Sequence, residues 1–189
     1  MTDFDPLKIK KQWKQSVLNK TNISFYEVDA HNIVPCQYAS SKQEWAAYTF
    51  RPKINRLLEE FLDEFPELQQ HPYKRNLNKI EINWNKIFEN INAEKRVEPV
   101  SWIKSGEEHA LARLNDFIEN KLDKYAELRN DPTLDFQSNM SPYLHFGQIS
   151  AQRIALEILK SKKNEESKKA YLEELIVRRE LADNFCFYN

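Results

Sequence analysis

Three side chains near the end of the sequence could bind a flat polar ligand. Tyr171, Glu174 and Arg178 lie at positions i, i+3 and i+7 of a predicted helix with the sequence YLEELIVRRELADNF. This spacing places a ring, a carboxyl and a guanidinium on one helix face. A planar polar molecule fits such a face. The alternative is an exposed Glu174–Arg178 ion pair, which would contribute only about 0.3–0.5 kcal/mol.

A second stretch, SNMSPYLHFGQIS over residues 138–150, contains helix start and stop signals. Ser141 and Pro142 predict an N-cap and a first helical residue, Gly147 predicts the end of that helix, and Ser150 predicts the next N-cap. Free N–H groups at a helix N-terminus bind phosphate well. The alternative is ordinary turn and cap chemistry, for which Ser and Asn are common.

The first half of the sequence predicts one strand between helices. Residues 5–20 form a basic amphipathic helix, and residues 23–29 form an apolar strand for which no second strand is found. Residues 44–65 predict another helix, which Arg51-Pro52 should break or kink. A polar spacer then extends to about Pro99.

The second half predicts long helices. Ser105 and Glu108 form a capping box for a helix whose apolar stripe reaches Tyr125 and which ends at Asp131-Pro132. From the pattern alone, Tyr125 is a core tyrosine with its hydroxyl in water. The apolar pattern of the last helix continues to the end of the sequence, so we expect residues 185–188 to lack packing partners and the unpaired strand to favour association.

Composition excludes several classes of protein. The chain has 189 residues, is 41% hydrophobic and 30% charged, and contains only 2 glycines, which favours a soluble, mainly helical protein. It shows neither a long apolar run nor an N-terminal leader, which predicts an intracellular protein that is not membrane-bound. The two cysteines and four histidines show no metal-ligand spacing, so we expect reduced thiols and no metal site.

Four blocks of the sequence resemble the photolyase/cryptochrome family, and most closely its class II cyclobutane-pyrimidine-dimer DNA photolyases. The blocks are residues 5–13, 27–54, 129–150 and 171–185. The resemblance implies a mainly α fold, the helical FAD-binding portion of a photolyase preceded by a remnant, one helix and one strand, of a Rossmann-like α/β antenna domain. The implied domains are the antenna remnant (1–40), a helical connector (41–100) and the first part of a truncated FAD/DNA-binding domain (101–189). The chain is thus expected to be an internal fragment.

The resemblance also implies roles for individual residues. It assigns Glu174 to catalysis, as an acid that is protonated or shares a proton while it hydrogen-bonds the damaged pyrimidine. The residues that it places against FAD are Tyr125, Gln137, Ser138, Asn139, Met140, Ser141 and Arg178. The residues that it places against DNA are Tyr171, Glu174, Arg178 and Arg179.

The function implied by the resemblance is light-driven, FAD-dependent repair of pyrimidine dimers in double-stranded DNA. The formal net charge of −1 does not itself indicate a DNA-binding protein. Two alternatives stay open. A light sensor of the cryptochrome type would use the same flavin segment without repair, and an inactive helical fragment or protein-interaction piece would do neither. The missing halves of a photolyase could exist as a separate chain.

Overall fold

The computed structural model describes residues 1–70, 72–73, 81–91, 96, 98 and 100–189. The chain forms two compact units, one of residues 1–64 with 105–189 and one of residues 65–104. The second unit contains the helix α4 (Trp84–Asn90), inside the stretch predicted to be a polar spacer. Asn83 begins α4 by accepting a hydrogen bond from the Lys86 N–H at 3.0 Å.

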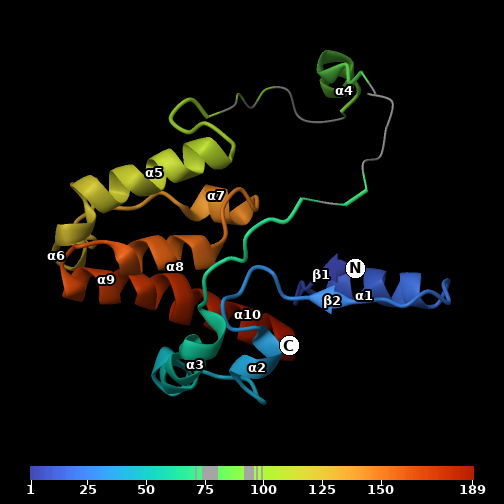
Figure 1. Cartoon of the computed structure of the whole chain (residues 1–189), viewed down its shortest axis with the longest axis horizontal. Helices are drawn as coiled ribbons and strands as arrows, with labels where there is room; N and C mark the ends of the chain where they lie inside the picture. Colours follow the sequence, from blue (N-terminus) through green and yellow to red (C-terminus); the bar gives the residue numbers. More distant parts are fainter. Residues whose placement is uncertain (71, 74–80, 92–95, 97, 99) are drawn as a thin grey trace. The chain divides into compact units, whose positions relative to one another are not determined.

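The first unit is mainly helical, as predicted (Figure 1). Its N-terminal part contains β1 (Thr2–Asp3), α1 (Lys8–Leu18), β2 (Glu27–Val28), α2 (Cys36–Ala39) and α3 (Ala47–Phe61). Its C-terminal part contains α5 (Glu107–Asn120), the 3₁₀ turn η1 (Leu122–Lys124), α6 (Tyr125–Leu128), α7 (Ser141–His145), α8 (Ala151–Lys160), α9 (Glu165–Leu172), the π-helical turn η2 (Glu173–Arg178) and α10 (Arg179–Tyr188).

The strand is not alone, contrary to the prediction. β1 pairs in parallel with β2, Thr2 opposite Glu27 and Asp3 opposite Val28. The pairing is supported by the Thr2 N–H, which donates to the Tyr26 carbonyl at 2.8 Å, and by the Phe4 N–H, which donates to the Val28 carbonyl at 2.8 Å. A two-residue strand carries no alternation that a sequence pattern could reveal.

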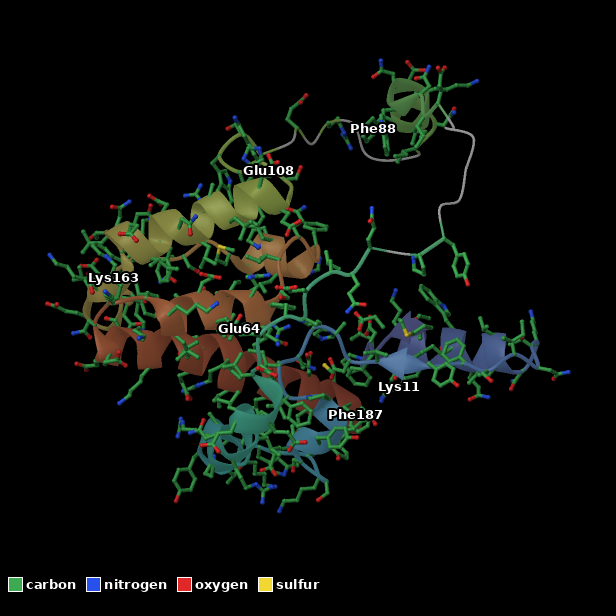
Figure 2. The ribbon with its side chains drawn as sticks, in the orientation of Figure 1. Lys11, Glu64, Phe88, Glu108, Lys163 and Phe187 are labelled. Atoms are coloured by element: carbon green, nitrogen blue, oxygen red, sulfur yellow. The ribbon has the colours of Figure 1, made fainter. Side chains whose placement is uncertain are left out.

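The end of the chain also has packing partners, which corrects a second prediction. The Phe187 ring lies 5.7 Å from the Phe4 ring, and Lys11 Nζ donates to the Phe187 carbonyl at 2.8 Å (Figure 2). The Tyr188 hydroxyl donates to the Ser40 carbonyl at 2.8 Å. Phe185 stays 51% exposed and Tyr188 38% exposed, so the segment is covered only in part.

Helix boundaries differ from the prediction where backbone chemistry overrides the pattern. Gly106, not Ser105, precedes α5, with φ +113° and its N–H donating to Gln148 Oε1 at 2.8 Å. A φ in this region favours glycine, so the expected capping box does not form. α3 continues through Pro52, because the carbonyl that the proline leaves unpaired is that of Tyr48, a first-turn residue that is 81% exposed. Ser150 caps α8 as predicted, accepting from the Arg153 N–H at 3.1 Å.

The core of the first unit brings the predicted functional segments together. α9 packs against α6 and α8, and η2 packs against α3 (Figure 1). α8 buries Ala151, Ile154, Ala155, Leu156 and Ile158, whereas α1 buries none of its residues. Among the described residues, no helix is both long and apolar enough to cross a bilayer.

Candidate functional site

The candidate site is built on three aromatic rings. Phe117 of α5 lies 4.7 Å from Tyr171 of α9 and 5.5 Å from Tyr125 of α6, and the two tyrosine rings lie 5.3 Å apart, edge to face. All three are buried, and burial raises the pKa of both tyrosines. The rings therefore fix α5, α6 and α9 relative to one another, and both phenols stay neutral at physiological pH.

The segment before α7 is fixed to this aromatic cluster through Ser138. Its Oγ accepts from the Tyr171 hydroxyl at 3.2 Å and from the Met140 N–H at 3.4 Å. The hydroxyl proton of Ser138 is thus available to a ligand. Asn139 has φ +55° and Met140 is 1% exposed, so the chain turns sharply here and anchors itself in the core. Ser141 starts α7 and is exposed.

Arg129 connects this segment to Glu174. Its Nη1 lies 2.9 Å from Glu174 Oε1, and its guanidinium carbon lies 5.7 Å from the centre of the Tyr125 ring. The Arg129 carbonyl accepts from Gln137 Nε2 at 2.6 Å. Sequence reasoning assigned no role to Arg129, although it begins the resembling block 129–150. Its partner lies 45 positions away, beyond the reach of helical spacing.

The predicted site residues therefore form one cluster, which we call the Tyr125 cluster. It comprises Tyr125, Arg129, Gln137, Ser138, Tyr171 and Glu174. The side chain of Glu174 is 41% exposed and that of Arg129 is 27% exposed. Polar groups that solvent and ligands can reach thus lie beside the packed, buried rings of Phe117, Tyr125 and Tyr171.

Arg178 and Arg179 have other partners. Arg178 is 56% exposed and its Nε lies 3.5 Å from Glu173, which also forms a two-pronged pair with Arg51 at 2.7 and 2.8 Å. The alternative Glu174–Arg178 ion pair does not form, since each side chain has a different partner. Arg179 donates to the carbonyl of His31. The π-helical turn η2 separates these residues, because it changes the spacing on which the single-face prediction rested.

A cavity of about 930 Å³ lies in the same unit, between the N-terminal segment, α7 and α10. Ser141 and Arg179 line it, together with Trp13, His31 and Asp183. Of the predicted residues, Ser141 and Arg179 thus line this cavity rather than the Tyr125 cluster, and Asn139, Met140 and Arg178 belong to neither. In the described part of the chain, no three His, Cys, Asp or Glu side chains gather as a metal site.

Comparison with known proteins agrees with this arrangement. The structure of a bacterial class III photolyase from Agrobacterium tumefaciens superimposes with a TM-score of 0.60 over 99% of this chain and 41% of that chain. At 20% sequence identity, this likeness shows the fold: the first unit has the helical architecture of photolyases.

Sequence relatives extend the finding. Residues 1–71 match the DNA photolyase family. The whole chain is 44% identical over 192 residues to the deoxyribodipyrimidine photo-lyase of Potorous tridactylus, and 41% and 37% identical to those of Arabidopsis thaliana and Methanothermobacter thermautotrophicus. It spans 36%, 40% and 41% of their respective lengths. Along its whole length the chain is thus similar to deoxyribodipyrimidine photo-lyases, of which it spans less than half.

Proposed function

We propose that this chain forms part of a class II deoxyribodipyrimidine photo-lyase, which uses light and FAD to repair cyclobutane pyrimidine dimers in double-stranded DNA. The observation that carries the proposal is the Tyr125 cluster. Segments around residues 125, 138 and 174 meet there, and each was assigned to flavin or lesion by resemblance. Beside the buried rings, the side chains of Arg129 and Glu174 stay partly exposed, so polar groups of the cluster can meet a ligand.

The residues present fit a dinucleotide ligand. Ser138 has a hydroxyl proton to donate. Three residues later, Ser141 is exposed and is the first residue of α7. Such donors suit phosphate oxygens. FAD, when bound and reduced, would supply the light-driven electron. Ser138 and Ser141 would hold its phosphates. Tyr125 would limit its position from the buried side.

The pairing of Glu174 with Arg129 refines the proposed role of the acid. The sequence predicted a carboxyl that is protonated or shares a proton, but its partner here is a guanidinium, which is a permanent donor. Oε1 accepts from Arg129 and leaves Oε2 to accept a hydrogen bond from a pyrimidine N–H. Arg129 has further N–H groups, which could stabilise negative charge on a pyrimidine carbonyl as it develops.

A chimera tests this proposal. This chain would replace the homologous segment of the Potorous tridactylus relative, since it matches only 36% of that protein. We expect the chimera to retain flavin through purification and to split pyrimidine dimers in irradiated DNA under light. The control is the unchanged relative. A chimera that binds flavin but repairs nothing would favour the light-sensor alternative, and a folded chimera without flavin would contradict the proposed cofactor site.

A further inference from the structure

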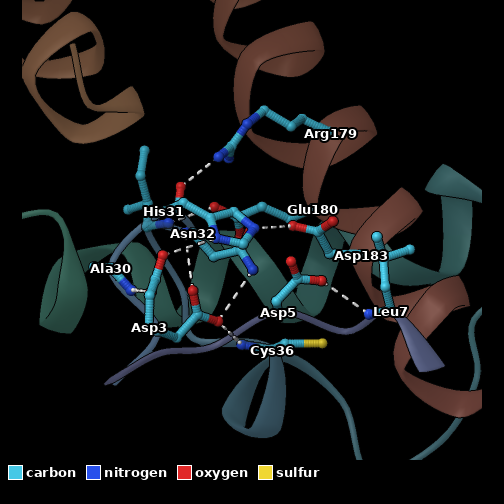
Figure 3. Close-up of polar contacts among 12 residues, drawn as sticks. Asp3, Asp5, Leu7, Ala30, His31, Asn32, Cys36, Arg179, Glu180 and Asp183 are labelled. Atoms are coloured by element: carbon cyan, nitrogen blue, oxygen red, sulfur yellow. Dashed lines mark hydrogen bonds and ion pairs between the residues drawn. The ribbon is translucent and has the colours of Figure 1, made fainter. Parts of the chain in front are cut away.

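The segment of residues 29–36, between β2 and α2, is held almost entirely by carboxylates (Figure 3). Asp3 accepts from the Ala30 N–H at 3.0 Å, and Asp29 accepts from the N–H groups of Asn32 and Cys36 at 3.1 and 2.9 Å. From α10, Asp183 pairs with His31 at 2.9 Å. The side chains of one helix thus hold a segment about 150 positions away.

Glu180 of α10 is the most deeply buried of these acids. It is 2% exposed, and its Oε1 accepts from the Ile33 N–H at 2.7 Å and from the Val34 N–H at 3.4 Å. Its other oxygen, Oε2, is buried and has no hydrogen-bond partner among the described residues. Of the charged groups that affect its ionisation, Arg179 lowers its pKa and Asp29 raises it.

The neighbouring side chain of Asn32 has the same deficiency. Asn32 is 7% exposed, and its Nδ2 donates to Asp29 Oδ2 at 3.0 Å, which settles the orientation of its amide. Its Oδ1 is buried and, within the described ranges, accepts from no donor. Two buried acceptors without donors, on residues that meet at the same short segment, would both be destabilising.

A single proton satisfies both atoms. An ionised carboxyl can only accept hydrogen bonds, whereas a neutral one carries an O–H donor. We propose that Glu180 is a neutral carboxylic acid whose Oε2–H donates to Asn32 Oδ1, and that this bond and protonated His31 form a clasp between residues 29–36 and α10 that weakens as the pH rises. The bond leaves Oε1 free for the two backbone N–H groups.

Electrostatics support this assignment for both groups. Burial raises the pKa of Glu180 to about 8, against the lowering effects of the Ile33 N–H and Arg179. The pKa of His31 is raised chiefly by its hydrogen bond with Asp183, which outweighs burial; the charges of Asp183 and Asp29 add to it, and Arg179 opposes it. Asp3 also faces the ring, 3.9 Å from Nδ1.

Both shifts give the same sign of pH dependence. A folded-state pKa above the unfolded value adds stability at low pH that is lost as the pH rises through the folded pKa. For Glu180 the loss runs from about its ordinary value of 4.5 to about 8. For His31 it begins near 6.5 and ends at the raised value. The clasp is therefore tight in mild acid and loose in mild alkali.

The first test is the carboxyl ¹³C titration of Glu180 by NMR in the complete 189-residue chain. We expect a midpoint near 8. Asn32→Ala removes the acceptor of the neutral form, so it should lower that midpoint by about one pH unit. A midpoint near 4.5 in the unaltered chain would overturn the proposal, and so would a midpoint that Asn32→Ala leaves unchanged.

The second test is urea unfolding across pH. Glu180→Gln stays neutral and can still donate to Asn32 and accept from Ile33. Between about pH 5 and pH 7, unfolding of the unaltered chain releases one proton more than unfolding of Glu180→Gln. For each pH unit, the unfolding constant of the unaltered chain should therefore rise by a factor about ten times larger than that of Glu180→Gln. Glu166→Gln, on an exposed acid of α9, is the control. Equal pH slopes for Glu180→Gln and the unaltered chain would refute the neutral acid.

Discussion

The C-terminal helices α9, η2 and α10 follow one another without a break, and similar polar residues have different roles in the two halves of this helical run. In the upstream half, up to Arg178, Glu174 is 41% exposed in its side chain and pairs with the side chain of Arg129. In the downstream half, Glu180 and Asn184 are 2% and 0% exposed and bond backbone N–H groups of residues 33, 34 and 44. Accessible polar groups can meet a ligand, whereas buried ones hold the chain.

The π-helical turn η2 forms the end of the upstream half: it carries Glu174 and stops at Arg178. A π turn adds a residue to the local repeat, so side chains after it face directions that a continuous α-helix would not give them. The two-pronged pair of Arg51 with Glu173 connects this turn to α3. η2 thus carries the last residues of the site-bearing half, and the fold-bearing half begins directly after it.

The largest effect on stability should follow from removing the ring of Phe117, which packs against the upstream half. Phe117 is 1% exposed and contacts both Tyr125 and Tyr171. Phe117→Ala should lower the free energy of unfolding by about 3–5 kcal/mol, because a buried ring is replaced by a cavity. Urea unfolding measures it. Phe185→Ala, on the 51% exposed ring of the downstream half, should stay within about 0.5 kcal/mol, and equal losses would break the comparison.

Glu174→Ala in the chimera should impair chemistry more than folding. Removing the carboxylate leaves a pyrimidine N–H without its acceptor, at a cost of about 1–3 kcal/mol, or roughly 5- to 150-fold in repair per photon absorbed. Flavin content should be nearly unchanged, since Ser138 and Ser141 lie elsewhere in the proposed site. Repair and flavin absorbance are measured on the same sample. Undiminished repair would return Glu174 to the role of a surface ion-pair partner.

Lys53→Met would remove the ion-pair partner of a second buried acid, Glu44, and so make its surroundings resemble those of Glu180. Glu44 has a side chain that is 3% exposed; burial opposes its ionisation, but hydrogen bonds from Lys53 and Ser40 outweigh burial and lower its pKa to about 2. Its stabilising contribution is thus present above its ordinary value of 4.5 and is lost as the pH falls towards 2.

Without Lys53, the free energy of unfolding at neutral pH should fall by about 1–2 kcal/mol. This is less than for a fully buried pair, because Lys53 is 34% exposed in its side chain. The loss of stability on acidification should also occur at a higher pH than in the unaltered chain. Lys42→Met, on the loop that carries Glu44, serves as the control. An unchanged stability at acid pH would show that Ser40 and Thr49 lower the pKa of Glu44 without Lys53.

Local patterns predicted what depends on local spacing. The helical class, the buried position of Tyr125 and the Ser150 cap are confirmed, because apolar repeats and cap residues act within a few positions. The partnership of Arg129 with Glu174 and the clasp of Glu180 could not be found this way, since their partners lie 45 and 147 positions away. β1 is too short for any pattern, and η2 interrupts a sequence that favours a continuous α-helix.

The smallest effect on folding is expected for Arg178→Ala, and this makes it the sharpest probe of the upstream half. Arg178 is 56% exposed and lies 3.5 Å from a Glu173 that keeps its two bonds to Arg51, so its loss should change the free energy of unfolding by no more than about 0.5 kcal/mol. The resemblance nevertheless assigns Arg178 to flavin or DNA. In the chimera, Arg178→Ala should therefore lose flavin during gel filtration while the urea midpoint stays constant. Arg153→Ala, on an exposed helical ion pair of α8, is the matched control for removing a surface guanidinium. If both variants retained flavin equally, Arg178 would belong with Glu173 and Arg51 to the support of the π turn. The accessible half of the helix would then reach its ligand through Glu174, whose side chain is 41% exposed.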